Sequence, residues 1–174
     1  MKQFAAVTMI AFAALTIGAS AALVQTTPKV PPTYEQVIAR NWKDVHNKIL
    51  AMAKDTVYHD AKLGWKPHPD SRSVIDELRH VTIGLEMTTA QAKGEKYDFE
   101  AKEAEYAKRP QTRAAVVGEM EKAIAASYAV LDAPGAKPAP SLVGWLEHQG
   151  EHYGKLVTSY RVNGIVPPIS RPKS

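Results

Sequence analysis

Apolar residues recur at three- and four-residue spacing in four segments of the chain, and no segment alternates for long with the two-residue period of a strand. The segments run from residue 33 to about residues 57–60, and then over 73–94, 112–133 and 141–163. As helices, segments of roughly twenty residues are about 30 Å long, and they can bury their apolar faces only against one another. The pattern therefore predicts an all-α fold, a four-helix bundle.

Polar and helix-breaking residues mark the ends of these segments. Gly94 closes the second segment, and Gly164, followed by Pro167 and Pro168, stops the fourth. Each segment begins at a hydroxyl side chain that can cap the backbone N–H groups of the first turn. These expected caps are Thr33, Ser73, Thr112 and Ser141.

The three connections between the segments differ in character. Residues 64–73 hold two prolines two positions apart, which excludes a helix and predicts a rigid connector. Residues 95–110 are polar and long for a bundle connection, with a short helix predicted around 99–108. Residues 134–140 are rich in proline and form the last loop.

The N-terminus has the features of a cleavable signal peptide. It holds Lys2, an apolar run, and the small-residue triplet Ala19-Ser20-Ala21, after which cleavage is expected. The run, about residues 4–17, is shorter than the ~20 residues of a membrane span, and no later segment is longer or more apolar. We therefore expect a periplasmic or secreted protein without a stable membrane span. An uncleaved signal anchor is the alternative.

About 150 residues remain after cleavage, which is enough for one domain with a single core. No internal repeat divides them further. The expected limits are a signal peptide at 1–21, an extended leader at 22–32, the bundle at 33–166 and a proline-rich tail at 167–174.

The composition excludes several kinds of chemistry. The chain has no cysteine, which rules out disulfides, thiolate nucleophiles, iron–sulfur clusters and zinc fingers. A metal site would have to use His, Asp and Glu, and imidazole ligands favour Zn, Ni or Fe(II). The 22 Lys and Arg residues are interspersed with 18 Asp and Glu residues, so we expect a solvated surface and no nucleic-acid binding.

Three of the six histidines form a candidate metal site. His148 and His152 are four residues apart, which places them about 40° apart on one face of the fourth helix, at the border of its apolar side. His80 lies in the middle of the second helix among apolar residues. If the two helices lie side by side, three imidazoles can hold one divalent ion and leave positions open for water or substrate. The alternative is that these histidines are only packed in the core or at its rim.

The remaining histidines are weaker candidates. His59 lies at a helix end and His68 between two prolines, and both are expected at the surface. His46, in the first helix, could face the core or the solvent.

Two other kinds of metal site are not supported, because the sequence lacks part of the motif that each requires. Glu77 and His80 form one ExxH, but a di-iron carboxylate bundle needs a second ExxH, and no glutamate stands three residues before either histidine of the fourth helix. A zinc protease of the HExxH type is excluded because that motif does not occur, and Gln149 follows His148.

Two blocks of the sequence, residues 64–81 and 147–168, resemble the DinB-like superfamily, which includes bacillithiol transferases and the mycothiol-dependent maleylpyruvate isomerase. In that family a Trp-x-Pro connector leads through a serine cap into a helix with one histidine. A last helix then carries HxxxH, and an arginine, a glycine and prolines follow. The matching residues are Trp65, Pro67, Ser73 and His80 in the first block, and His148, His152, Gly154, Arg161, Gly164 and Pro167 in the second.

The resemblance implies a four-helix bundle with an unusual crossover order, often a homodimer, whose three histidines surround a divalent metal in an open cleft. By that resemblance His80, His148 and His152 are the ligands, and the protein is a metal-dependent hydrolase or thiol transferase acting on a small molecule. The chain departs from the family at Lys155, where glutamine is usual. Export is a second departure, because the family's best understood members use cytosolic thiols.

Two further functions stay open at this point. One is a non-catalytic module of the cell envelope that binds a metal or a small ligand. The other is a structural bundle whose histidines are merely packed. His46, Glu77 and Glu151 are candidates for proton transfer, but each also fits a surface or supporting position, so the sequence does not identify a catalytic base.

Overall fold

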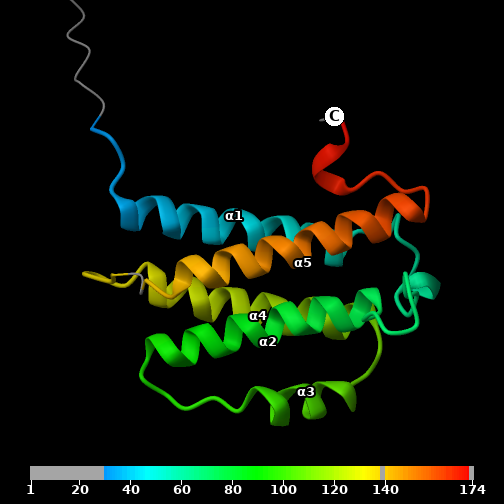
Figure 1. Cartoon of the computed structure of the whole chain (residues 1–174), viewed down its shortest axis with the longest axis horizontal. Coiled ribbons are helices and arrows are strands. Elements are labelled where there is room, and N and C mark those ends of the chain that lie inside the picture. Colours follow the sequence, from blue (N-terminus) through cyan, green and yellow to red (C-terminus); the bar gives the residue numbers. More distant parts are fainter. Residues whose placement is uncertain (1–29, 138–139, 173–174) are drawn as a thin grey trace, which may run out of the picture. The chain divides into compact units, whose positions relative to one another are not determined.

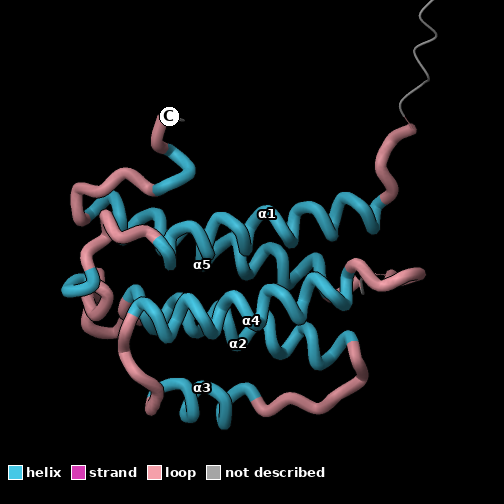
Figure 2. Tube along the Cα trace, turned by 180° about the vertical axis from the view of Figure 1, so that it is seen from behind, coloured by secondary structure: helices cyan, strands magenta, loops and turns pink. Residues whose placement is uncertain are grey.

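In the computed structural model, which describes residues 30–137 and 140–172, the chain forms five α-helices and two short 3₁₀ turns (Figure 1, Figure 2). The helices are α1 (Tyr34–Lys54), α2 (Val74–Ala92), α3 (Phe99–Ala107), α4 (Arg113–Leu131) and α5 (Leu142–Val162), and the turns are η1 (Asp60–Lys62) and η2 (Pro168–Ser170). These residues contain no strand, so the all-α prediction is confirmed.

The four long helices pack as two parallel pairs, and each of α1 and α2 contacts both α4 and α5. In the first pair, Lys48 of α1 lies over the ring of Tyr153 on α5. Further along both helices, the Tyr160 hydroxyl donates to the backbone oxygen of Met52 at 2.8 Å. α1 and α5 therefore run in the same direction, and α2 and α4 form the second parallel pair (Figure 1).

The parallel arrangement of α2 and α4 explains the long polar connection between them. A chain that leaves the end of α2 must return along the whole helix before α4 can start in the same direction. Residues 93–112 make this return, and α3, near the middle of this stretch, lies against α2 (Figure 1). The short helix predicted around 99–108 is confirmed.

Large aromatic side chains fill the interior. Trp42, Tyr58 and Tyr160 are fully buried. The indole N–H of Trp42 donates to Ser127 Oγ at 2.9 Å, and the rings of Tyr58 and Tyr160 stack with centroids 4.6 Å apart. Buried aromatic residues with a polar end are stable when that end has a partner. These contacts join α1, α4, α5 and the segment after α1 around one core.

The first helix ends earlier than the sequence predicts, at Lys54 rather than near residues 57–60. Arg113, the first residue of α4, donates to the backbone oxygens of Ala53 and Tyr58. These bonds hold the chain in a turn just after the helix and carry the Tyr58 side chain into the core. A tertiary contact therefore ends a helix that the local pattern would continue.

The other helix ends lie within two residues of their predicted places. The side chains of Thr33, Ser73 and Thr112 accept hydrogen bonds from the first turn, as expected. Ser141 precedes α5 but its side chain makes no capping bond, which corrects that prediction. Its backbone is already helical, with φ −60° and ψ −22°, whereas a capping residue is usually extended.

The predicted signal peptide at 1–21 lies outside the described residues, as does most of the leader at 22–32. Residues 30–32 have no regular secondary structure and are exposed. Among the described helices, none combines the length and the apolar character that a membrane span requires.

His46, whose orientation the sequence left open, points into the core and is fully buried. Its Nδ1–H donates to the backbone oxygen of Trp42 at 2.7 Å, while Nε2 has no hydrogen-bond partner among the described residues. Burial lowers the pKa of His46 from 6.5 to about 4, against the opposing effect of the bond to Trp42. The folded state therefore holds this imidazole neutral.

We expect His46 to make the fold sensitive to mild acid. In the unfolded chain His46 takes up a proton below about pH 6.5, whereas in the folded chain it does so only near pH 4, so protonation favours unfolding. The stabilisation that comes from keeping His46 neutral is fully present above about pH 6.5. About 2 kcal/mol of the free energy of unfolding is lost as the pH falls to about 5. Urea denaturation of the wild type and of His46→Leu tests this. The variant should lose that part of the pH dependence, and equal slopes would contradict the prediction.

Candidate metal centre

α2 and α5 approach each other closely near their middles. Gly84 of α2 lies at this contact, where a Cβ atom would be 2.8 Å from Nε2 of the buried Gln149 on α5. Atoms that are not hydrogen-bonded do not pack so closely, so the absence of a side chain at Gly84 permits the approach. His80 lies one helical turn before Gly84, and Gln149 directly follows His148. The same contact therefore brings the candidate ligands together.

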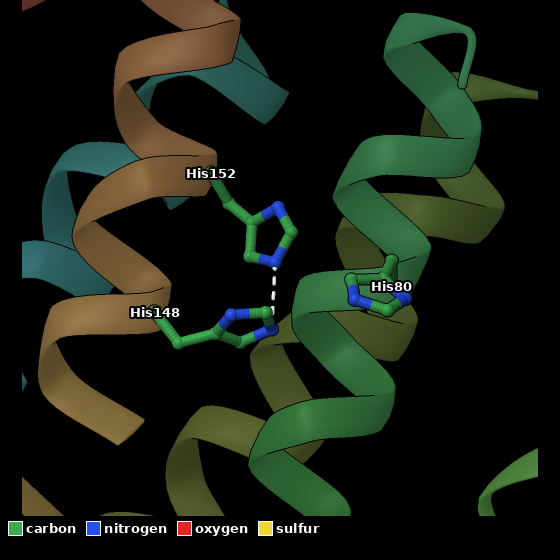
Figure 3. Close-up of side chains that lie close together, drawn as sticks. All are labelled: His80, His148 and His152. Carbon is green, nitrogen blue, oxygen red and sulfur yellow. Dashed lines mark hydrogen bonds between the residues drawn. The ribbon is translucent and has the colours of Figure 1, made fainter. Parts of the chain in front are cut away.

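Three histidines converge here: His80 from α2, and His148 and His152 from α5 (Figure 3). One nitrogen of each lies within 4.8 Å of the others. The Nε2 atoms of His148 and His152 are 2.9 Å apart. The ring centroid of His80 is 4.7 Å from that of His152 and 5.9 Å from that of His148. The helix contact on which a three-histidine cluster depends is therefore present.

These separations are compatible with one divalent ion. Imidazole nitrogens bind Zn at about 2.0–2.1 Å, so two of them on one ion are about 2.9 Å apart at a right angle and about 3.4 Å apart at the tetrahedral angle. The distance of 2.9 Å between the Nε2 atoms of His148 and His152 lies at the lower end of this range. A pair at the 4.8 Å limit would have to close by roughly 1.4 Å to reach the tetrahedral separation, which small side-chain movements can supply. The three residues could therefore hold a metal ion.

Two of the rings present their other nitrogen to a carboxylate on a different helix. His152 Nδ1 lies 2.7 Å from Glu77 Oε1, and His80 Nδ1 lies 2.9 Å from Glu103 Oε1. A carboxylate in this position accepts the Nδ1 proton, fixes the ring and leaves Nε2 with a free lone pair. This is the arrangement in which metal-binding histidines are usually held.

The third ring is held less firmly. His148 Nδ1 is 3.9 Å from Glu151 Oε2, which is too long for a hydrogen bond. The His148 side chain is 39% exposed, whereas that of His152 is 1% exposed. Because the Nδ1 proton of His152 is engaged by Glu77, the 2.9 Å contact between the two Nε2 atoms is a hydrogen bond in which His148 donates. The Nε2 proton of His148 must therefore move to Nδ1 before both Nε2 atoms can bind one cation.

Burial sets the protonation of the cluster. It lowers the pKa of His80, against the opposing effect of the bond to Glu103, and it lowers the pKa of His148 as well. Burial is the largest single effect and acts to raise the pKa of Glu77, but the hydrogen bond from His152 and the nearby basic side chains, Lys155 and Arg72 among them, together bring the pKa below its ordinary value. At neutral pH the His80 and His148 rings are therefore neutral and the Glu77 carboxylate is ionised.

Glu103 is the site residue that sequence analysis missed. It lies on α3, 23 residues after the histidine that it contacts, in a segment predicted only as a polar connection with a short helix. Glu86 of α2 holds this segment in place, because it accepts hydrogen bonds from Tyr97 at 2.8 Å and Tyr106 at 2.5 Å. The sequence predicted the short helix that carries Glu103, but it did not indicate which face of that helix would contact His80.

The other sequence candidates fall in different places. His59 and His68 are exposed, as predicted, and His46 is buried on α1 without belonging to the cluster. Glu77, the first residue of the ExxH, is buried and hydrogen-bonded to His152 rather than left at the surface. It therefore has a supporting position next to a candidate ligand.

No family model, curated protein or solved structure matches this chain. The resemblance to the DinB-like superfamily therefore stays a prediction from two sequence blocks.

The carboxylate contacts predict the tautomers of two rings in protein without added metal. His152 and His80 should carry their proton on Nδ1, whereas a free imidazole prefers Nε2, because Glu77 and Glu103 accept from Nδ1. Two-bond ¹⁵N–¹H correlation spectra of the histidine side chains report the protonated nitrogen directly. A proton on Nε2 of His152 would contradict the hydrogen bond to Glu77.

Proposed function

We propose that this protein binds one divalent metal ion through His80, His148 and His152. The observation that carries the proposal is the convergence of three imidazole nitrogens from two helices within 4.8 Å of one another. Two of the rings are also oriented from behind by Glu77 and Glu103. Three nitrogen donors suit Zn, Ni or Fe(II), whereas Mg and Ca prefer oxygen. Three protein ligands leave coordination positions open for water or substrate.

We further infer that the protein is a metal-dependent hydrolase or transferase that acts on a small molecule. A divalent ion acts as a Lewis acid, which polarises a carbonyl or thiol and lowers the pKa of water. Glu77 and Glu103 orient the imidazoles of His152 and His80. Glu151, whose side chain is 59% exposed, has no hydrogen bond to the cluster and is the nearby carboxylate available to exchange a proton with a substrate.

We also propose that the protein has a DinB-like fold and that it is exported. The two sequence blocks support a DinB-like bundle, and the long crossover between the parallel helices α2 and α4 is compatible with the crossover order that the resemblance implies. The pattern of residues 1–21 supports export to the periplasm or beyond the cell. A homodimer is a further expectation from the resemblance.

One observation favours a second candidate, a non-catalytic module of the cell envelope that binds metal or a small ligand. Both carboxylates that touch the cluster, Glu77 and Glu103, are already engaged by histidines. They therefore act as orienting groups and not as free bases. Such an arrangement can hold an ion without turning over a substrate.

Metal analysis tests the shared part of both candidates. Protein purified from the envelope fraction should hold about one divalent ion per chain by mass spectrometry. Alanine at His80, His148 or His152 should weaken binding by more than the roughly 10–100-fold that loss of a supporting residue costs. His59→Ala and His68→Ala are matched controls, because both residues are exposed and outside the cluster, and they should bind like the wild type. If the three cluster variants held as much metal as the two controls, His80, His148 and His152 would not be metal ligands and would only be packed side chains.

Turnover separates the enzyme from the binding module. Metal-loaded protein should convert at least one member of a panel of esters, amides and pairs of an electrophile with a thiol. The rate should fall to background in His80→Ala and after chelation, because both remove the ion from the site. Activity that survives in His80→Ala would exclude the metal centre as its source. Stoichiometric metal without turnover would favour the binding module.

A further inference from the structure

A cleft of about 820 Å³ lies next to the histidine cluster, between the start of α2 and the second half of α5. Glu77 and Glu151, which face His152 and His148, form part of its wall. None of the three histidines lines the cleft, so it borders the cluster through these two carboxylates. Its remaining lining residues are Pro67, Asp70, Ser71, Arg72, Ser73, Val74, Gly154, Lys155, Thr158 and Ser159.

Two cations of the cleft each lie near one of the carboxylates that support the cluster. Lys155 Nζ is 3.8 Å from Glu77 Oε1, the oxygen that accepts from His152. Arg72 Nη2 is 3.5 Å from Glu103 Oε1, the oxygen that accepts from His80. Both distances are longer than a strong charge-assisted hydrogen bond, so neither cation is tightly engaged.

Both cations are also accessible to a ligand. The Arg72 side chain is 41% exposed and that of Lys155 is 56% exposed. Arginine presents a planar fork of donors that matches the geometry of carboxylate and phosphate groups, and lysine adds a compact charge with three donors. Together they can bind an oxyanion in the cleft beside the histidines.

The acidic groups around the cleft determine whether an anion can bind there. Asp70, Glu77, Glu103 and Glu151 oppose the two cations, so without a metal ion the region carries more negative than positive charge. A divalent ion at the histidines cancels this excess, because two cationic side chains and two charges of the ion then face four carboxylates. The ion therefore removes the electrostatic obstacle to a further anion.

We propose that Arg72 and Lys155 form the anion-binding part of a substrate site, and that the molecule which reaches the metal centre carries a carboxylate or phosphate group. This inference rests on the proposed metal centre, because the anion binds only when the ion is present. It names the substrate class that the geometry of the cluster does not determine. It also assigns a role to Lys155, where the DinB-like pattern has glutamine.

Anion titrations of the cobalt(II)-loaded protein test the proposal. Benzoate and phenyl phosphate share one ring and differ in their anionic group, and benzamide is the neutral control. Calorimetry and the visible spectrum of cobalt, neither of which requires turnover, should report binding of at least one anion and not of benzamide. Comparison of the two anions distinguishes a carboxylate site from a phosphate site. The metal-free protein should bind neither anion measurably.

Charge-neutral variants identify the residues. Arg72→Gln and Lys155→Gln should each weaken anion binding roughly tenfold, since each removes one partly exposed charged donor. Cobalt should bind these variants as tightly as the wild type or more tightly, because a nearby positive charge has been removed. Lys155→Arg should retain anion binding. Lys122→Gln, which changes an exposed lysine on α4 outside the cleft, should behave like the wild type.

The outcomes separate this inference from the metal proposal. Cobalt bound without any anion affinity, or with equal affinity in wild type, Arg72→Gln and Lys155→Gln, would overturn the anion site and leave the metal centre standing. Anion binding of the same strength in metal-free protein would overturn the required role of the ion. Failure of the wild type to bind cobalt would overturn the metal centre and the anion site together.

Discussion

The hydrogen bond between Glu77 and His152 joins α2 to α5 through two side chains that are largely shielded from water. The two atoms are 2.7 Å apart, and the side chains are 8% and 1% exposed. A hydrogen bond to a charged group contributes about 1.5–3 kcal/mol, and removing the His152 side would leave the buried Glu77 carboxylate without this partner. The pair therefore stabilises the contact between the two helices. It also directs Nε2 of His152 toward His148, so one interaction shapes both the bundle and the cluster.

The direction of the helices supplies the second supporting carboxylate. Because α2 and α4 are parallel, the chain must run back along α2, and α3 lies on that return path. Glu86 ties the path to α2 through Tyr97 and Tyr106 and so keeps Glu103 against His80. A connection that a simple antiparallel bundle would not need thus becomes one wall of the candidate metal centre.

Polar groups in the interior distinguish this bundle from one with a purely apolar core. Gln149 is fully buried, and both polar atoms of its side chain lack a hydrogen-bond partner among the described residues, as does Nε2 of His46. Such groups reduce the stability that burial of the apolar faces provides. Gln149 nevertheless lies at the close contact with Gly84, beside the histidines. The candidate site therefore lies next to a buried polar group that lowers the stability of the core.

The sequence by itself determined the features that depend on local spacing. These are the four long helices, their limits to within a few residues, and the placement of His148 and His152 on one helix face. Tertiary structure alone decided that Glu103 supports His80, that Arg113 ends α1 early and that His46 faces the core. Each of these depends on how two helices meet, and periodicity shows which face of a helix is apolar but not which neighbour it will contact.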